Sequence, residues 1–193
     1  NIGGGIVIYA GEVELKNVTI THNSAVHTGS GIFNMGKLTI NNTIIWGNIL
    51  TDEITEPIPH QIYIKTSTEN NQNISVNYSN IEGGEDGIIS DADEMGGVVD
   101  ITWGQYNIDA NPLFCDSENG DFYLDNNSPC AGSGQDETYM GALGIGCVEV
   151  YGCIDLNACN YIPEANVDDG SCEYAMENFD CDGNCIAAED ECS

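Results

Sequence analysis

The sequence predicts an all-β chain in which a parallel β-helix is followed by a small disulfide-rich module. A repeat of about 25 residues in the first half, strand-like alternation inside each copy, and nine cysteines confined to the chain after residue 114 predict this fold. We expect the β-helix over 1–147, with an acidic loop at about 82–100 and closing coils over 107–147. A linker (148–152) and an acidic disulfide-rich module (153–193) are expected to follow.

The repeat is visible as aligned copies of one motif. "GEVELKNVTITHN" (Gly11–Asn23) is matched at an offset of 25 by "GKLTINNTIIWGN" (Gly36–Asn48), and "QNISVNYSNIEGG" (Gln72–Gly84) follows an insertion at about residues 50–61. Apolar residues alternate within each copy, which is typical of strands. A unit this short cannot bury its apolar face alone, so the copies are expected to stack. A β-sandwich is the alternative, but it does not need this repeat.

Asparagine recurs at two turn positions of the aligned copies. Asn17 corresponds to Asn42, and Asn23 corresponds to Asn48. Asparagine tolerates the left-handed backbone of tight turns, and asparagines stacked in successive coils form hydrogen-bonded ladders. We therefore expect these four side chains to be structural ladder residues and not ligand contacts.

Several segments carry a resemblance to a known family. The coils "GGGI…LKNVTITHNSA" and "GSGI…LTINNTIIWGN", with "VNYSNIEGG" (Val76–Gly84), "NIDANPLFCDSENGDFYLDNNSPCAGSG" (Asn107–Gly134) and "MGALG" (Met140–Gly144), are similar to bacterial secreted β-helix proteins of the pectate-lyase-like fold. The resemblance spans residues 1–146 approximately. It implies a right-handed coil and the C-terminal part of a longer extracellular or cell-surface protein.

The resemblance raises the question of catalysis, because that fold includes polysaccharide lyases and glycoside hydrolases. A lyase of this kind needs an Arg or Lys base beside calcium, and the chain has three lysines and no arginine. A hydrolase needs paired carboxylates on adjacent coils, and residues 1–50 contain no aspartate. We expect no catalytic residues and a non-enzymatic structural or adhesive scaffold. The alternative is the C-terminal part of a lyase or hydrolase whose catalytic coils lie upstream.

The charge of the chain limits its partners. With 32 acidic residues against three lysines, the formal net charge is −29, which argues against nucleic acid because phosphate binding requires Lys and Arg. No stretch approaches the roughly 20 apolar residues of a membrane span. We expect extracellular carbohydrate or another surface protein as partner, or self-association through the ends of the β-helix.

Two acidic regions are candidates for weak calcium binding. The first is the loop "EGGEDGIISDADEMGGVVD" (Glu82–Asp100), expected to leave the solenoid. Alternate oxygens and a glycine turn are typical of calcium loops, although a solvated acidic loop explains the same residues. The second lies in the C-terminal module, where Asp168-Asp169-Gly170 is equally a simple turn. The candidate ligands are Asp91, Asp93, Glu94, Asp168, Asp169, Asp180 and Asp182. No other cofactor is expected.

The cysteines are predicted to form disulfides. Cys115 and Cys130 bracket a short excursion, and the β-helix resemblance implies that they pair, which stabilises by about 3 kcal/mol. "GCIDLNACNYIPEANVDDGSC" (Gly152–Cys172) resembles a small repeat of secreted proteins from marine Bacteroidetes-type bacteria. Its spacing does not fit zinc. Six cysteines allow 15 pairings, which leaves the connectivity open, and we expect Cys147 or Cys192 to be left over. The predicted disulfide cysteines of the module are Cys153, Cys159, Cys172, Cys181, Cys185 and Cys192.

Overall fold

The structure is a computed structural model of the chain, and it describes residues 3–51, 61–66, 72–92, 97–147 and 149–186. The chain divides into two units, Asn1–Cys147 and Val148–Ser193. In chain order, the strands of the first unit are β1 (Ile6–Ile8), β2 (Glu12–Lys16), β3 (Thr19–Thr21), β4 (Ser24–Ala25), β5 (Ile32–Asn34), β6 (Lys37–Asn41), β7 (Ile44–Trp46), β8 (Ile49–Leu50), β9 (Ile62–Ile64), β10 (Gln72–Asn77), β11 (Asn80–Ile81), β12 (Ile88–Ser90), β13 (Val99–Trp103), β14 (Phe114–Asp116) and β15 (Asp121–Leu124).

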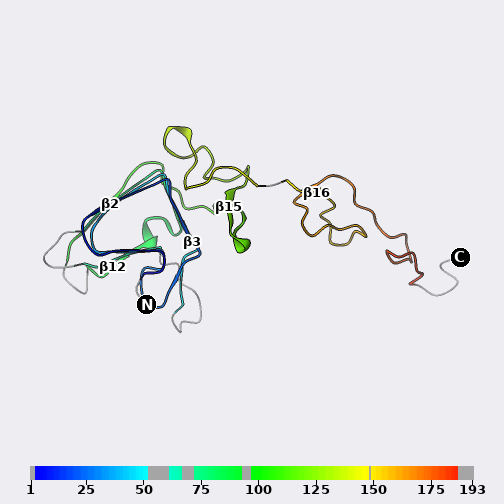
Figure 1. Cartoon of the computed structure of the whole chain (residues 1–193), viewed down its shortest axis with the longest axis horizontal. Helices are drawn as coiled ribbons and strands as arrows, with labels where there is room; N and C mark the ends of the chain where they lie inside the picture. Colours follow the sequence, from blue (N-terminus) through cyan, green and yellow to red (C-terminus); the bar gives the residue numbers. More distant parts are fainter. Residues whose placement is uncertain (1–2, 52–60, 67–71, 93–96, 148, 187–193) are drawn as a thin grey trace. The chain divides into compact units, whose positions relative to one another are not determined.

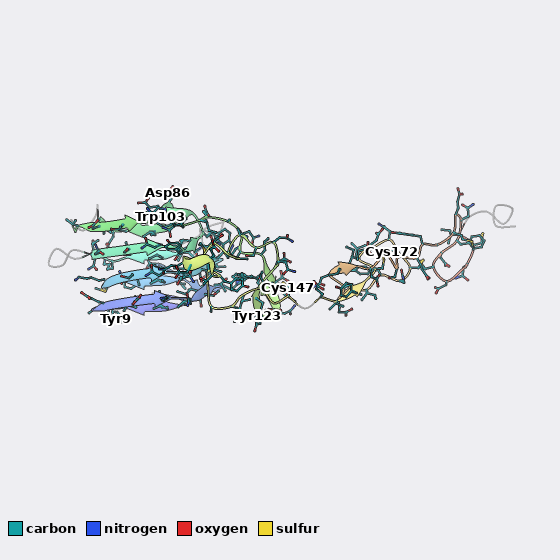
Figure 2. The ribbon with its side chains drawn as sticks, turned by 90° about the horizontal axis from the view of Figure 1, so that it is seen from above. Tyr9, Asp86, Trp103, Tyr123, Cys147 and Cys172 are labelled. Atoms are coloured by element: carbon teal, nitrogen blue, oxygen red, sulfur yellow. A yellow bond between two sulfur atoms is a disulfide. The ribbon has the colours of Figure 1, made fainter. Side chains whose placement is uncertain are left out.

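The first unit is a solenoid of stacked parallel strands, which confirms the predicted parallel β-helix. Among the described residues, strands from equivalent positions of successive coils form the sheets β1-β5-β9-β12, β2-β6-β10-β13 and β3-β7-β11. The coil is three-sided, with β2, β3 and β12 on different sides (Figure 1). Seen from the side, the strands lie as stacked rungs (Figure 2).

The register of the strands agrees with the aligned copies of the repeat. Val13 pairs with Leu38, and Leu15 pairs with Ile40, which is the offset of 25 seen in the sequence. Leu38 pairs in turn with Ile74. Alternate residues along β6 and β10 face the interior, and the core cluster of buried isoleucine, leucine and valine side chains runs through these coils. Burial of this stripe is what holds the coils together.

The acidic segment 82–100 does not leave the solenoid as predicted. Residues Gly84–Gly87 form the short 3₁₀ helix η1, and β12 then pairs with β9. After the undescribed residues 93–96, β13 pairs with β10 along five residues, with Ile74 opposite Ile101. The segment therefore belongs to the next coil. Paired positions are 25 residues apart between β2 and β6, but 26 apart between β9 and β12 and 27 apart between β10 and β13, and this change of spacing hid the coil in the sequence.

The closing coils end in an antiparallel hairpin. Strands β14 and β15 pair with each other around the 3₁₀ helix η2 (Ser117–Asn119). Leu124, Cys130 and Met140 are buried against Ile44 in a second core cluster. The chain between Cys130 and Met140 includes the 3₁₀ helix η3 (Gln135–Glu137).

The predicted bridge between Cys115 and Cys130 is wrong. Cys115 pairs with Cys147, one of the two cysteines predicted to be left over, and Cys130 is a buried free thiol. Asn80 donates a hydrogen bond from Nδ2 to the Cys130 sulfur over 3.0 Å. Burial raises the pKa of the Cys130 thiol, so this side chain belongs to the packed core and stays protonated.

The second unit has little regular structure in its described part. Strands β16 (Tyr151–Gly152) and β17 (Val167–Asp168) form a two-residue parallel pair. Disulfides join Cys153 to Cys172 and Cys159 to Cys181. Cys185 is also disulfide-bonded, and Cys192 lies outside the described residues. Because β16 is part of the module, the predicted linker at 148–152 extends too far.

Three disulfides with both ends described indicate that the chain folds in an oxidising environment. Within the described ranges, no helix has the length and apolar character needed to cross a membrane.

Candidate functional site

The four predicted ladder asparagines are hydrogen-bonded in two pairs between successive coils. Asn42 donates from Nδ2 to Oδ1 of Asn17 over 2.7 Å. Asn23 donates from Nδ2 to Oδ1 of Asn48 over 3.0 Å. Amide side chains suit this position because each has both a donor and an acceptor to pass along the stack.

The Asn23–Asn48 ladder continues into later coils through different residues. Asn48 donates to Oε1 of Gln61 over 2.7 Å, and Gln61 donates from Nε2 to Oε2 of Glu82 over 2.7 Å. Glu82 also accepts a hydrogen bond from the backbone amide of Gly47. Asn48 and Gln61 are fully buried. A continuous chain of satisfied buried polar groups fixes the register of the coils.

The Asn17–Asn42 position is a corner where every coil adopts a left-handed backbone. Asn17, Asn42, Tyr78 and Tyr106 have φ values of 54°, 54°, 49° and 60°. The amides of Asn17, Asn42 and Tyr78 donate in turn to the carbonyls of residues 41, 77 and 105, each just before the next corner residue. The corner is therefore the same in four coils, and its occupant changes from asparagine to tyrosine.

The two corner tyrosines stack on each other across the coils. The ring centroids of Tyr78 and Tyr106 are 5.0 Å apart, and the ring planes are inclined by 20°. Tyr106 keeps 63% of its surface exposed. An aromatic pair of this kind is an apolar surface with a polar hydroxyl at its edge.

Asn42 attaches the closing segment to this corner. Its Oδ1 accepts a hydrogen bond from the amide of Gln135 over 2.9 Å, and its Nδ2 donates to the carbonyl of Tyr139 over 2.8 Å. A Cβ atom at Gly134 would lie 2.2 Å from Oδ1 of Asn42, so the close approach requires glycine there. One ladder asparagine thus fixes a loop more than 90 residues away in the sequence.

Between the tyrosines and this loop lies a cleft of about 440 Å³, which we call the corner cleft. Its volume lies within the range of small-molecule binding sites. The tyrosine pair and Ile108 of the coils line it together with residues 132–134 and 136–137 of the closing segment. The full lining is Tyr78, Tyr106, Ile108, Gly132, Ser133, Gly134, Asp136 and Glu137.

Two carboxylates of η3 line the corner cleft. Asp136 and Glu137 are exposed, and both have a left-handed φ of 58°. Such a backbone costs about 1–3 kcal/mol for a residue other than glycine, and the hydrogen bonds of Asn42 and Thr138 hold the loop in place. Within the described ranges, neither carboxylate has a hydrogen-bond or ion-pair partner. They are available to accept hydrogen bonds from a ligand.

Sequence reasoning missed the corner cleft. Alignment of Asn77-Tyr78-Ser79 with Asn41-Asn42-Thr43 would have placed Tyr78 at the ladder corner, because Asn77 pairs with Asn41. No sequence pattern predicts that Asp136 and Glu137 line the corner cleft, since their position depends on the long-range contacts of Asn42.

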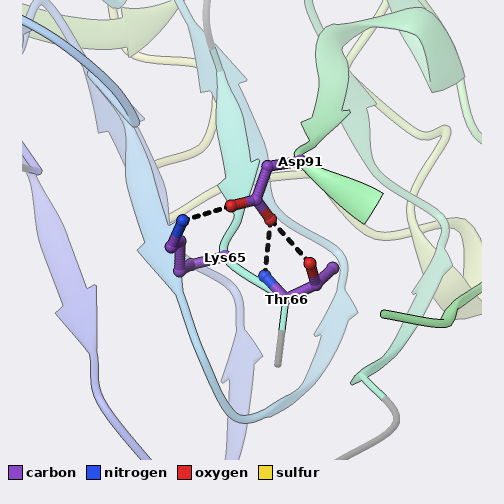
Figure 3. A network of polar contacts seen from close by, with 3 residues as sticks. All are labelled: Lys65, Thr66 and Asp91. Carbon is purple, nitrogen blue, oxygen red and sulfur yellow. Dashed lines mark hydrogen bonds and ion pairs between the residues drawn. The ribbon is translucent and has the colours of Figure 1, made fainter. Parts of the chain in front are cut away.

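Asp91, a predicted calcium ligand, is instead part of a buried polar network (Figure 3). The amide and the hydroxyl of Thr66 donate to its Oδ1 over 2.7 and 2.8 Å, and Lys65 forms an ion pair with its Oδ2. Burial alone would raise the pKa of Asp91, but the hydrogen bonds from Lys65 and Thr66 outweigh burial and hold this pKa below 3.8. Its charge is already compensated, so its role here is structural. Asp93 and Glu94 lie outside the described residues.

We expect Asp91→Ala to lower the free energy of unfolding by about 2–3 kcal/mol, because Thr66 then keeps buried donors without an acceptor. A carboxyl group whose pKa is lowered by folding stabilises at pH values above its unfolded pKa, and this contribution is lost as the pH falls through the folded pKa. The difference between wild type and variant should therefore be constant above about pH 5 and shrink below about pH 4. Urea unfolding as a function of pH measures it. Asp100→Ala, at an exposed position, is the control, and an equal effect of both variants would contradict the role of Asp91.

The aspartates of the C-terminal module stabilise turns. Asp168 accepts from the amide of Gly170, and Asp169 accepts from the amide of Ser171. Asp180 accepts from the amides of Asp182 and Asn184. In the described part of the chain, no group of three or more His, Cys, Asp or Glu residues is arranged to hold a metal ion. Calcium binding by Asp168, Asp169, Asp180 and Asp182 remains a prediction from the sequence.

No protein-family model, no curated protein and no solved structure matches the chain. The solenoid and the disulfide-rich C-terminal unit are observed, whereas the bacterial family suggested by the motifs remains an interpretation.

Proposed function

We propose that this chain is a non-enzymatic extracellular scaffold whose solenoid presents the corner cleft to carbohydrate. The observation that carries the proposal is the corner cleft itself, whose lining combines the stacked Tyr78 and Tyr106 with Asp136 and Glu137. A pyranose ring has an apolar face of C–H groups and an edge of hydroxyls. Aromatic side chains match the face, and carboxylates accept hydrogen bonds from the hydroxyls.

The rigid support of the corner cleft favours this function. The tyrosines occupy fixed corners of the coil, and the opposite wall is held by the hydrogen bonds of Asn42. A preformed site loses little conformational entropy on binding. The three disulfides with both ends among the described residues suit an oxidising extracellular setting. Self-association through the ends of the coil stack remains a separate prediction, which light scattering tests.

Binding of the full chain to an array of immobilised oligosaccharides tests the proposal. We expect retention of at least one class of glycan, with about a tenfold loss of affinity for Tyr106→Ala, because one exposed aromatic contact is worth about 1–1.5 kcal/mol. Tyr9→Ala removes another exposed tyrosine, outside the corner cleft, and should not change binding. Absence of glycan retention would contradict the proposal, and cleavage of a retained glycan would favour the enzymatic alternative.

A further inference from the structure

The charged side chains that line the corner cleft indicate which class of carbohydrate it binds. We infer that the corner cleft binds an amino-sugar oligosaccharide, with the protonated amine held by Asp136 and Glu137 and the sugar ring against Tyr106. This inference rests on the carbohydrate-facing function proposed above, and it specifies the ligand of the same cleft.

The charge that lines the corner cleft is unbalanced. Its lining contains two carboxylates and no basic side chain, in a chain of formal net charge −29. An anionic sugar would meet like charge both at the cleft wall and over the whole approach to it. A neutral sugar would use the carboxylates only as acceptors, whereas an ammonium group forms charge-assisted hydrogen bonds with them, which are about twice as strong.

The aromatic pair also favours a cationic ligand. An ammonium group within about 6 Å of an aromatic face is attracted by the ring quadrupole, with about 0.5–1 kcal/mol at exposed sites. Tyr78 and Tyr106 line the same cleft as the two carboxylates. A ligand that carries its amine on a pyranose ring brings the cation to the carboxylates while its apolar face lies against tyrosine. Tyrosine and carboxylate then act on adjacent parts of one sugar.

Among the described residues, no side chain of the chain competes for the two carboxylates. The lysines of the chain are Lys16, Lys37 and Lys65, and none of them lines the corner cleft. The backbone of Asp136 and Glu137 is held in its left-handed form by Asn42 and Thr138, whose contacts leave both carboxylate groups unused within the described residues. The wall is therefore preorganised for a cation that the chain itself does not supply.

Isothermal titration calorimetry with four tetrasaccharides tests the inference on the full chain. The probes are β-1,4-linked glucosamine, its N-acetylated form, the neutral glucose tetramer and a galacturonate tetramer, at about pH 5.5, where the amine is protonated and most carboxyl groups are ionised. We expect the glucosamine tetramer to bind at least tenfold more tightly than the others. Its affinity should fall several-fold between about 0.05 and 0.5 M NaCl, because exposed charges are screened.

Matched variants separate the corner cleft from diffuse attraction to an acidic protein. The double variant Asp136→Asn with Glu137→Gln should weaken glucosamine binding about tenfold. The control Glu14→Gln with Glu85→Gln removes the same charge from exposed positions that do not line the corner cleft, and it should bind like wild type. An equal loss in both double variants would overturn the assignment to this cleft.

Two further outcomes distinguish the inference from the function on which it rests. Equal affinity for the glucosamine, N-acetylated and neutral tetramers, reduced by Tyr106→Ala, would overturn the amino-sugar assignment and leave the carbohydrate-facing function in place. The absence of binding for every tetramer, together with an empty glycan array, would overturn both.

Discussion

Replacing Asn48 by alanine is expected to lower the free energy of unfolding of the solenoid by roughly 3–5 kcal/mol, which is a large fraction of the stability of a domain. The Asn48 side chain is fully buried. Its Oδ1 accepts hydrogen bonds from both the amide and the side chain of Asn23, and its Nδ2 donates to the carbonyl of Ile20 and to Gln61. Alanine would remove all four of these hydrogen bonds, and a buried group that loses its partner costs more than a hydrogen bond contributes.

The effect of this substitution should extend beyond one coil. Gln61 would lose the hydrogen bond that its Oε1 accepts from Asn48 and that helps to hold its Nε2 on Glu82, and Glu82 in turn holds the amide of Gly47. Since coils stabilise one another through their nearest neighbours, a break in the ladder weakens the coils on both sides.

Urea unfolding followed by circular dichroism measures the stability of this variant. Asn73→Ala is the matched control, because Asn73 lies on the outer side of β10 with one 3.4 Å contact to Asp100. Surface changes of this kind stay within about 0.5 kcal/mol. If Asn48→Ala were as mild as Asn73→Ala, the ladder would not be a source of stability.

The ladders also show why so much of the solenoid could be predicted. Wherever the same residue type recurs at a constant spacing, the sequence contains the register directly, as for Asn17 with Asn42 and for Leu15 with Ile40. The recurring side chains and the alternation of apolar residues then predict the same strands in the same register. The prediction of the coils from the sequence is wrong where the number of residues between paired strands changes. The sequence predicts an acidic loop where the coil with β12 and β13 lies, because carboxylates, and not apolar residues, dominate the sequence there.

The candidate site was hidden for a related reason. At the corner of the coil the occupant changes from Asn42 to Tyr78 while the backbone stays the same. A search for recurring asparagine stops at that point. The opposite wall of the corner cleft comes from contacts between Asn42 and residues 135–139, which no local pattern encodes.

The partners of Asp91 and Cys130 could not be predicted from the sequence around these residues. An aspartate in an acidic stretch suggested calcium, but its partners Lys65 and Thr66 lie about 25 residues away on the preceding coil. Cys130 lies between Cys115 and Cys147 in the sequence. The β-helix resemblance implies that it pairs with Cys115, with which it brackets a short excursion, although its side chain is buried in the core beside Asn80. Both errors arise because stacking, and not sequence distance, decides which side chains meet.

The C-terminal module should lose its structure when Cys153 and Cys172 are both replaced by serine. In its described part, residues 149–186, only Gly152, Cys153 and Ala158 are buried. Such a core supplies almost no hydrophobic stabilisation. The Cys153–Cys172 bridge closes a loop with a sequence separation of 19, which is worth about 3 kcal/mol in the chain-entropy model. Removal of this bridge is therefore expected to lower the free energy of unfolding of the module by more than the net stability of so small a unit.

Hydrogen exchange, measured for individual amides, distinguishes unfolding of the C-terminal module from unfolding of the solenoid. In the double variant, the amides of Cys159 and Ile162, bonded to the carbonyls of Glu173 and Cys153, should exchange as in an unfolded chain. The amides of β6 and β10 should keep their protection, since their coils are held by buried isoleucine, leucine and valine. The double replacement of Cys115 and Cys147 by serine is the matched control: it removes a bridge from a unit with a large core, which should remain folded. Protection that survived in the module after loss of the Cys153–Cys172 bridge would mean that its hydrogen bonds hold it without this bridge, contrary to what its burial predicts.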